Sequence, residues 1–149
     1  EIDTRGLEDG AVITKDIKLK KKDLYDGKVL EYVYFDYMKY NLDKEDKAKL
    51  DSVAVFLNSR EDFIVRLEGH TDQRGELDYN QKLSEERALA AYDYLLKKKS
   101  VPAHKILHVG FGETRPVEDC SKYKECPTTG QPDCPCHEKN RRTECVLFQ

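Results

Sequence analysis

Three polar side chains in the middle of the sequence could contribute to one ligand site. Asp72 lies in a polar segment, residues 69–75, and Asn80 and Arg87 follow it in a segment of helical periodicity. Asn80 and Arg87 are seven residues apart, so they share one face of a helix and can address the same point. A carboxylate and a guanidinium that flank one pocket would hold a ligand with a positive and a negative group. The alternative is a structural Asp–Arg ion pair, because charged residues near helix starts are common.

The segments on either side are expected to form a strand and a helix that position these side chains. Residues 62–68 alternate as in a half-buried strand. The helix begins after Gly75 and turns the apolar side chains between Leu83 and Leu96 inward. The polar segment therefore lies between the end of a strand and the start of a helix. At such a place, loop side chains and free backbone N–H groups can converge on a ligand.

A second amphipathic helix and further strands complete the expected fold. From Asp43, apolar residues recur at helical spacing up to Leu57, over about four turns, and Asp43 followed by Asp46 favours capping at the start. Residues 11–14, 29–37, 105–109 and 143–148 have the composition of strands. This order predicts an α+β sandwich with helices packed on one face of a sheet.

Composition excludes several classes of protein. The chain has 149 residues, enough for one domain, and its 26 basic and 29 acidic residues give a net charge of -3. This balance offers no general attraction to nucleic acid or anionic lipid. No apolar stretch approaches the ~18 residues that cross a bilayer, and the first residues lack the features of a secretory signal. We expect no nucleic-acid partner, and contact with a membrane only through a missing upstream segment or a partner protein.

Four cysteines, Cys120, Cys126, Cys134 and Cys136, lie within seventeen residues rich in Pro, Gly and Lys. Such an irregular segment buries little apolar surface, so disulfides are the expected means of ordering it. Disulfides persist in an oxidising compartment such as the periplasm or the cell exterior. Cys134 and Cys136 are too close to bond each other without strain. Two pairings stay open: Cys120–Cys134 with Cys126–Cys136, or Cys120–Cys136 with Cys126–Cys134.

A zinc knuckle that also uses His137 is the rival interpretation of this segment. Its spacing lacks the paired C-x2-C of common zinc modules, which argues against it. The fifth cysteine, Cys145, lies in the apolar run of residues 145–148, where we expect a free and buried thiol.

Five blocks of the sequence, in order, resemble the OmpA-like peptidoglycan-binding domain, the C-terminal domain of OmpA that is also seen in Pal and MotB. The resemblance covers roughly residues 29–148, and the interval of fifteen residues from Asp72 to Arg87 also matches. The blocks are Gly69-His70-Thr71-Asp72, then Gly75, then Tyr79-Asn80 with Leu83-Ser84 and Glu86-Arg87-Ala88, then Gly110-Phe111-Gly112-Glu113 with Pro116, and Asn140-Arg141-Arg142-Thr143-Glu144.

The resemblance implies a two-layer sandwich in which a mixed β-sheet carries two main helices on one face. Residues 29–149 would form the OmpA-like domain, with an inserted cysteine-rich loop at residues 118–138. That loop looks like a version found in Bacteroidetes members of the family. Residues 1–28 would be an N-terminal lead-in that either adds strands to the sheet or leads from a preceding domain.

The resemblance also implies a function: non-covalent binding of peptidoglycan through the meso-diaminopimelate of its stem peptide, without catalysis and without a cofactor. By match to the motif, Asp72 would take the side-chain ammonium of diaminopimelate and Arg87 its carboxylate, through charge-assisted hydrogen bonds. Asn80 would add a neutral hydrogen bond and Leu83 an apolar floor. The domain would lie in the periplasm, tethered to the outer membrane, and would anchor that membrane or one of its complexes to the cell wall.

Four further residues complete the ligand-binding set that the resemblance implies. Thr71 directly precedes Asp72 in the motif. Phe35 and Asp36 would contribute backbone groups from the segment Phe35-Asp36-Tyr37, near the end of the first core strand. Arg141, the first arginine of the last block, would lie close by.

Two other functions stay open from the sequence. One is a zinc-dependent cell-wall hydrolase assembled from His70, Asp72 and the Cys-His cluster, although no H-E-x-x-H or comparable ligand pair is present. The other is an interaction or stator module that uses the same fold without binding diaminopimelate directly.

Overall fold

A four-stranded sheet and two long helices make up most of the described chain, residues 27–126 and 133–149, in a computed structural model. The elements in order are β1 (Lys28–Tyr34), α2 (Lys44–Asn58), β2 (Ile64–Gly69), α3 (Leu77–Asp93), β3 (Ile106–Gly110), α4 (Pro135–Asn140) and β4 (Arg142–Phe148). A π-helical segment, Tyr94–Lys98, extends α3. The strand expected at residues 11–14 lies outside the described residues.

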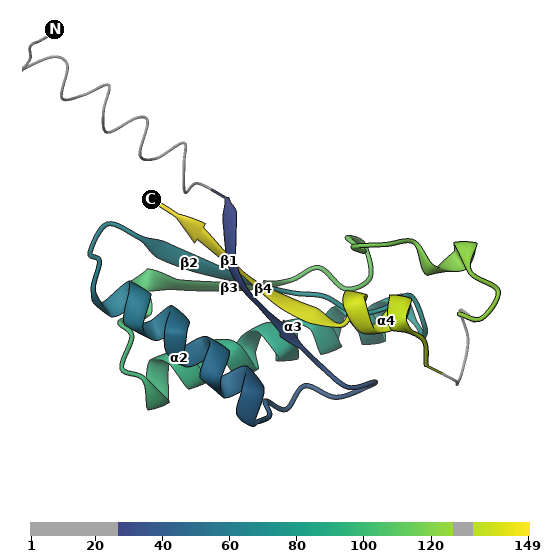
Figure 1. Cartoon of the computed structure of the whole chain (residues 1–149), viewed down its shortest axis with the longest axis horizontal. Coiled ribbons are helices and arrows are strands. Elements are labelled where there is room, and N and C mark those ends of the chain that lie inside the picture. The colour runs from purple at the N-terminus through teal and green to yellow at the C-terminus, as the bar shows by residue number, and fades with distance from the viewer. Residues whose placement is uncertain (1–26, 127–132) are drawn as a thin grey trace, which may run out of the picture.

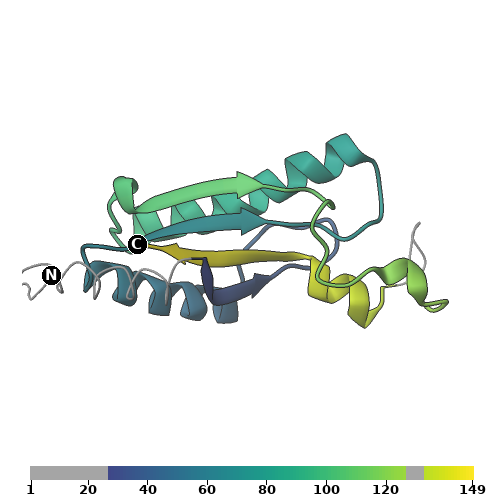
Figure 2. The ribbon, with the colours of Figure 1, turned by 90° about the horizontal axis from the view of Figure 1, so that it is seen from above.

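The sheet is mixed, with the strand order β1-β4-β2-β3. The last strand, β4, lies between β1 and β2 and is antiparallel to both, whereas β2 and β3 are parallel. Helices α2 and α3 cover the same face of this sheet (Figures 1 and 2). The expected α+β sandwich, a mixed sheet with two main helices on one face, is confirmed.

The core lies between the sheet and these two helices. Val65 and Leu67 of β2 and Leu50 and Leu57 of α2 are completely buried there. Because each fully buried side chain of this kind stabilises the fold by about 1.5–3 kcal/mol, this layer holds the helices in place. The site described below depends on that placement, since α3 supplies several of its residues.

Helix α3 approaches the end of β2 closely because β2 ends in a glycine. A Cβ atom at Gly69 would overlap the backbone carbonyl of Ser84 in α3. Ser84 is fully buried, and its hydroxyl accepts a hydrogen bond from the Gly112 N–H after β3 (2.8 Å). These contacts fix the N-terminal half of α3 against the ends of two parallel strands.

Helix α2 begins where the sequence predicts. Asp43 accepts a hydrogen bond from the Asp46 N–H (2.8 Å), and Asp46 accepts one from the Asp43 N–H (3.1 Å), so the two residues form a capping box. Burial raises the pKa of Asp46 to about 6.

Strand β1 is shorter than the strand expected at residues 29–37. It ends at Tyr34, although the Phe35 N–H still donates to the Arg141 carbonyl (3.0 Å). The chain then turns, and Met38 adopts a positive φ of 58°. The turn directs residues 36–39 toward α3 rather than along the sheet. This turn forms one wall of the cavity described below.

The four clustered cysteines form two disulfides, Cys120–Cys136 and Cys126–Cys134. The structure thus selects one of the two pairings that the sequence left open, and these bonded sulfurs offer no thiolate for a zinc knuckle. The segment is not all loop, because the short helix α4 begins directly after Cys134, with proline in its first turn.

Cys145 in β4 is free and buried, as predicted. Burial raises the pKa of its thiol to about 12. Among the described residues, none of the helices combines the length and the apolar character needed to cross a membrane.

Candidate functional site

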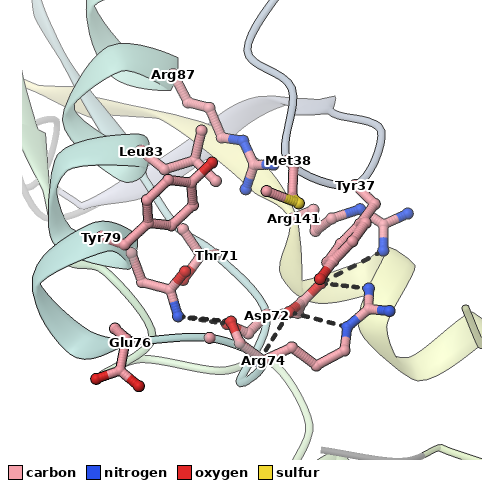
Figure 3. A pocket seen from close by; sticks show the side chains of 12 residues that line it. Tyr37, Met38, Thr71, Asp72, Arg74, Glu76, Tyr79, Leu83, Arg87 and Arg141 are labelled. Atoms are coloured by element: carbon pink, nitrogen blue, oxygen red, sulfur yellow. Dashed lines mark hydrogen bonds and ion pairs between the residues drawn. The ribbon is translucent and has the colours of Figure 1, made fainter. Parts of the chain in front are cut away.

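A cavity of about 240 Å³ lies at the end of the sheet where β2 leads into α3 (Figure 3). Three parts of the chain surround it: the turn after β1, the loop after β2 and the first turns of α3. Arg141, between α4 and β4, closes one side. The lining residues are Tyr37, Met38, Thr71, Asp72, Arg74, Gly75, Glu76, Tyr79, Asn80, Leu83, Arg87 and Arg141.

Asp72 enters this cavity from the loop after β2 and is almost completely buried. Its carboxylate accepts hydrogen bonds from Arg74, through the backbone N–H (3.0 Å), Nε (3.3 Å) and Nη2 (2.7 Å). A second cation, the Arg141 guanidinium, lies 3.5 Å from the same carboxylate. These contacts hold Asp72 in one orientation and compensate part of its charge.

Arg87 enters the cavity from α3 and is fully buried. Its guanidinium donates to three backbone carbonyls: Lys39 (2.8 Å), His70 (3.0 Å) and Asp36 (3.1 Å). Among the described residues it forms no ion pair. Burial, and then the nearby charge of Arg141, lower its pKa to about 10, so it stays cationic at neutral pH. Arg87 is therefore a rigidly held cation that can bind an anionic group in the cavity.

Asn80 is buried one turn into α3, and its amide braces the loop that carries Asp72. The side-chain NH2 donates to the Arg74 carbonyl (2.9 Å) and to the Glu113 carboxylate (2.9 Å). Leu83, one turn further along, is buried and supplies an apolar part of the wall.

Thr71 has an unused polar atom in this wall. Its backbone N–H donates to the Gly112 carbonyl (2.9 Å), but the hydroxyl is buried and has no hydrogen-bond partner in the described chain. Since buried hydroxyl groups are normally paired, this one is suited to contact a ligand.

Phe35 and Asp36 do not line the cavity, but their backbone carbonyls contact its arginines, and the centre of the Phe35 ring also lies 5.2 Å from the Arg87 guanidinium. The Phe35 carbonyl accepts a hydrogen bond from Arg141 Nε (2.7 Å), and the Asp36 carbonyl accepts the bond from Arg87 described above. The Phe35 ring is part of the core. The structure thus brings six of the eight expected binding residues to the cavity and places these two behind its arginines.

Four residues of the cavity were not expected as ligand-binding residues from the sequence, namely Met38, Arg74, Glu76 and Tyr79, and Tyr37 was expected only through its backbone. The Arg74 guanidinium lies 4.0 Å from the centre of the Tyr37 ring, so these two side chains form one wall. For Arg74 and Met38, the available signal was their proximity in sequence to Asp72 and to Phe35-Asp36, and Tyr79 stood beside Asn80 in a motif block.

The charges in the cavity can hold a ligand that carries both signs. The lining contains three arginines, Arg74, Arg87 and Arg141, and two carboxylates, Asp72 and Glu76, so it has an excess of one positive charge. Asp72 and Arg87 are not paired with each other, and the figure shows their side chains entering from different elements with the cavity between them (Figure 3). An ammonium at Asp72 and a carboxylate at Arg87 would each meet an opposite charge.

Residues 34–126 match the model of the OmpA family. Among curated proteins, the chain is similar to the peptidoglycan-associated lipoprotein of Rhizobium meliloti, with 30% identity over 115 residues, 77% of this chain and 58% of that protein. It is also similar to the outer membrane porin F of Pseudomonas aeruginosa, with 39% identity over 87 residues, 58% of this chain and 25% of that protein. The matched region thus spans less than two thirds of the length of each of these relatives.

Solved structures show the same fold. The peptidoglycan-associated lipoprotein from Burkholderia pseudomallei matches with a TM-score of 0.66 and 28% identity, over 78% of this chain and 88% of that one. The C-terminal domain of Helicobacter pylori MotB matches with a TM-score of 0.66 and 15% identity, over 80% of this chain and 85% of that one. At that identity, the second match supports the fold alone.

Proposed function

The chain belongs to the OmpA family, and from this premise we propose that its cavity binds peptidoglycan non-covalently through the meso-diaminopimelate of the stem peptide. The domain is a binding module and not an enzyme. Diaminopimelate suits the cavity because the free end of its side chain carries an ammonium and a carboxylate on one carbon atom.

One observation carries the proposal: Arg87 and Asp72 line the same cavity without neutralising each other. The ligand carboxylate would accept hydrogen bonds from the Arg87 N–H groups that the three backbone carbonyls leave unused. The ligand ammonium would donate to Asp72 and to the Thr71 hydroxyl. A buried site that removes water from a doubly charged group has to offer each end an opposite charge, and these residues do so.

The comparisons support peptidoglycan as the polymer. Two of the similar proteins are named peptidoglycan-associated lipoproteins, one of them matched in structure. Other similar proteins are outer membrane proteins, which supports a periplasmic domain tethered to the outer membrane. The two disulfides agree with this compartment because it is oxidising. Anchoring of the outer membrane, or of a complex in it, to the cell wall follows as the proposed role.

The test compares two peptidoglycans. Purified sacculi with diaminopimelate should retain the protein in a sedimentation assay, whereas sacculi of the lysine type should retain much less. The matching soluble peptides, L-Ala-γ-D-Glu-meso-diaminopimelate and its lysine counterpart, should differ in Kd by at least about tenfold, because lysine leaves Arg87 without its anion. Equal Kd values would remove the assignment of diaminopimelate. Failure to bind either type of sacculus would overturn the proposed function.

A further inference from the structure

The disulfide-bonded insertion supplies a carboxylate that completes the charge network of the cavity. We call the described parts of this insertion, residues 118–126 and 133–138, which contain both disulfides, the stapled segment. Its residue Asp133 forms a bidentate ion pair with Arg141, at 2.8 Å and 2.9 Å, and lies 3.2 Å from Arg74. Arg74 and Arg141 in turn contact Asp72 at 2.7 Å and 3.5 Å. Two cations and two anions therefore alternate in a closed ring.

The distances in this ring are unequal, and the inequality affects Asp72. Arg141 forms its short bidentate contacts with Asp133 and only a long contact with Asp72. A pair at 3.5 Å is weaker than one at 2.8 Å because charge-assisted hydrogen bonds need the shorter distance. Without Asp133, both arginines would have Asp72 as their one carboxylate in the ring. Asp133 thus draws Arg141 away from the carboxylate that faces the ligand.

The fold holds Asp133 at this place through the cysteines. Asp133 directly precedes Cys134, which is bonded to Cys126 and is the N-cap of α4. Asp133 also accepts a hydrogen bond from the Cys134 N–H (3.0 Å). At the other end of α4, the Arg141 N–H donates to the His137 carbonyl (3.2 Å). The short helix therefore fixes the distance between Asp133 and Arg141, and the disulfide fixes the start of the helix.

We propose that Asp133 is a positioning residue for ligand recognition: it holds Arg141 so that Asp72 keeps its negative charge available to a cationic group of the ligand. The inference rests on the proposed function, since the cation in question is the side-chain ammonium of diaminopimelate. The stapled segment then determines specificity for a free ammonium. The Asp133 side chain is 33% exposed, whereas Asp72, Arg74 and Arg141, on which it acts, are buried, so the charges of these three are less screened than charges at the surface.

The experiment measures discrimination between two ligands. Kd is determined for the stem tripeptide with a free side-chain ammonium and for the same peptide with that amine acetylated. The wild type should prefer the free amine. Asp133→Asn should lose affinity for the free amine by about tenfold and keep its weak affinity for the acetylated peptide, so the ratio falls. Asp133→Glu should restore part of the ratio because it restores the carboxylate.

Glu125→Gln is the matched control, because it removes one negative charge from an exposed position of the same segment. It should leave the ratio unchanged. A ratio for Asp133→Asn equal to that of the wild type and of Glu125→Gln would overturn the inference while leaving the proposed function intact. If the wild type binds neither peptide nor sacculi, the proposed function itself fails.

A second arm tests the role of the disulfide. Replacing Cys126 and Cys134 together with serine leaves the Cys120–Cys136 bond to hold the segment. The double variant should show the same reduced ratio, and adding Asp133→Asn to it should cause little further change. If Asp133→Asn still reduces the ratio tenfold without this disulfide, the disulfide does not position Asp133.

Discussion

The Asp72 carboxylate and the Arg87 guanidinium line one cavity, yet each is bound to other partners and not to the other. Asp72 is paired with Arg74, and Arg87 donates to three backbone carbonyls. The alternative considered from the sequence was a structural ion pair between Asp72 and Arg87. Such a pair would have neutralised both charges. Because backbone carbonyls orient Arg87 without cancelling its charge, its guanidinium is already in place for the anionic group of the proposed ligand.

Replacing Arg87 should abolish recognition of the ligand carboxylate. We expect Arg87→Ala to weaken binding of the diaminopimelate tripeptide by about 2–5 kcal/mol, as when one member of a buried interfacial charge pair is removed. Arg87→Lys should recover only part of this, because an ammonium cannot form the bidentate contact or reach all three carbonyls. Isothermal titration calorimetry gives the affinities, with circular dichroism to establish folding. The control Arg60→Ala, an exposed arginine of the loop after α2, should bind normally.

Replacing Asp72 should remove the other half of the recognition. Asp72→Asn keeps the shape of the side chain but leaves the ligand ammonium without an anion, so we expect a loss of about 2–5 kcal/mol in binding free energy. Arg74 keeps Asp133 as a partner, which should limit the effect on stability. Asp78→Asn, at an exposed position in the first turn of α3, is the control. Tight binding by Asp72→Asn would show that the ammonium does not bind there.

Part of the cavity lining could be predicted because three of its residues lie in one regular helix. Asn80, Leu83 and Arg87 share a helix face that periodicity reveals, and Asp72 precedes that helix by a short turn. Arg74 could not be placed in the same way, because a side chain in an irregular loop has no periodicity that fixes its direction. Its pairing with Asp72, two residues away, depends on how the loop closes under Asn80.

The position of Asp133 could not be predicted from the sequence, for a different reason. Its position depends on which cysteines are joined, and the spacing of the cysteines allowed two pairings. The helix that begins after it has only six residues and contains one proline and one cysteine, so its pattern resembles a loop. A backbone role for Phe35 and Asp36 was expected, but the arginines that their carbonyls bind could not be predicted, because the backbone geometry of a turn is not encoded in a side-chain pattern.

His70 should make the stability of the domain depend on pH. Burial, followed by the charges of Arg142 and Arg115, lowers the pKa of His70 to about 3. Glu68 and Glu144 face it, with their oxygens within 4.8 Å of a ring nitrogen. A histidine in the unfolded chain has a pKa of about 6.5. When the pKa is lower in the folded state, the histidine makes its full contribution to stability at pH values above about 6.5. That contribution is lost as the pH falls from there toward 3, because the unfolded chain takes up the proton first.

Urea denaturation measures this dependence. Between pH 7.5 and pH 4.5, the His70 contribution to the free energy of unfolding should fall by about 2–3 kcal/mol. His70→Phe should flatten the slope over this range, whereas His104→Gln, at an exposed position, should not. The His70 ring protons in NMR spectra provide a second measurement, and their chemical shifts should not titrate above pH 4. A normal titration near pH 6.5 would contradict the predicted burial.

Gly69 should be essential both for the fold and for the site, since it lets α3 lie against the end of β2. In Gly69→Ala the new methyl group would overlap the Ser84 carbonyl, so α3 has to move outward. We expect a loss of about 3 kcal/mol in unfolding free energy, at the upper end for overpacking because the obstacle is backbone.

The displacement of α3 should also weaken ligand binding, because the helix carries Arg87 and Asn80 while Asp72 stays with the sheet. Gly27→Ala separates this effect from a general loss of stability. Gly27 has a positive φ of 78° but nothing within 4 Å of an added Cβ, so that variant should lose about 1–2 kcal/mol from backbone strain alone. Measured at a temperature where both variants are folded, Gly27→Ala should bind the tripeptide like the wild type, and Gly69→Ala should bind it at least about tenfold more weakly. Equal affinities would mean that the distance between helix and strand does not control the distance between the two charges.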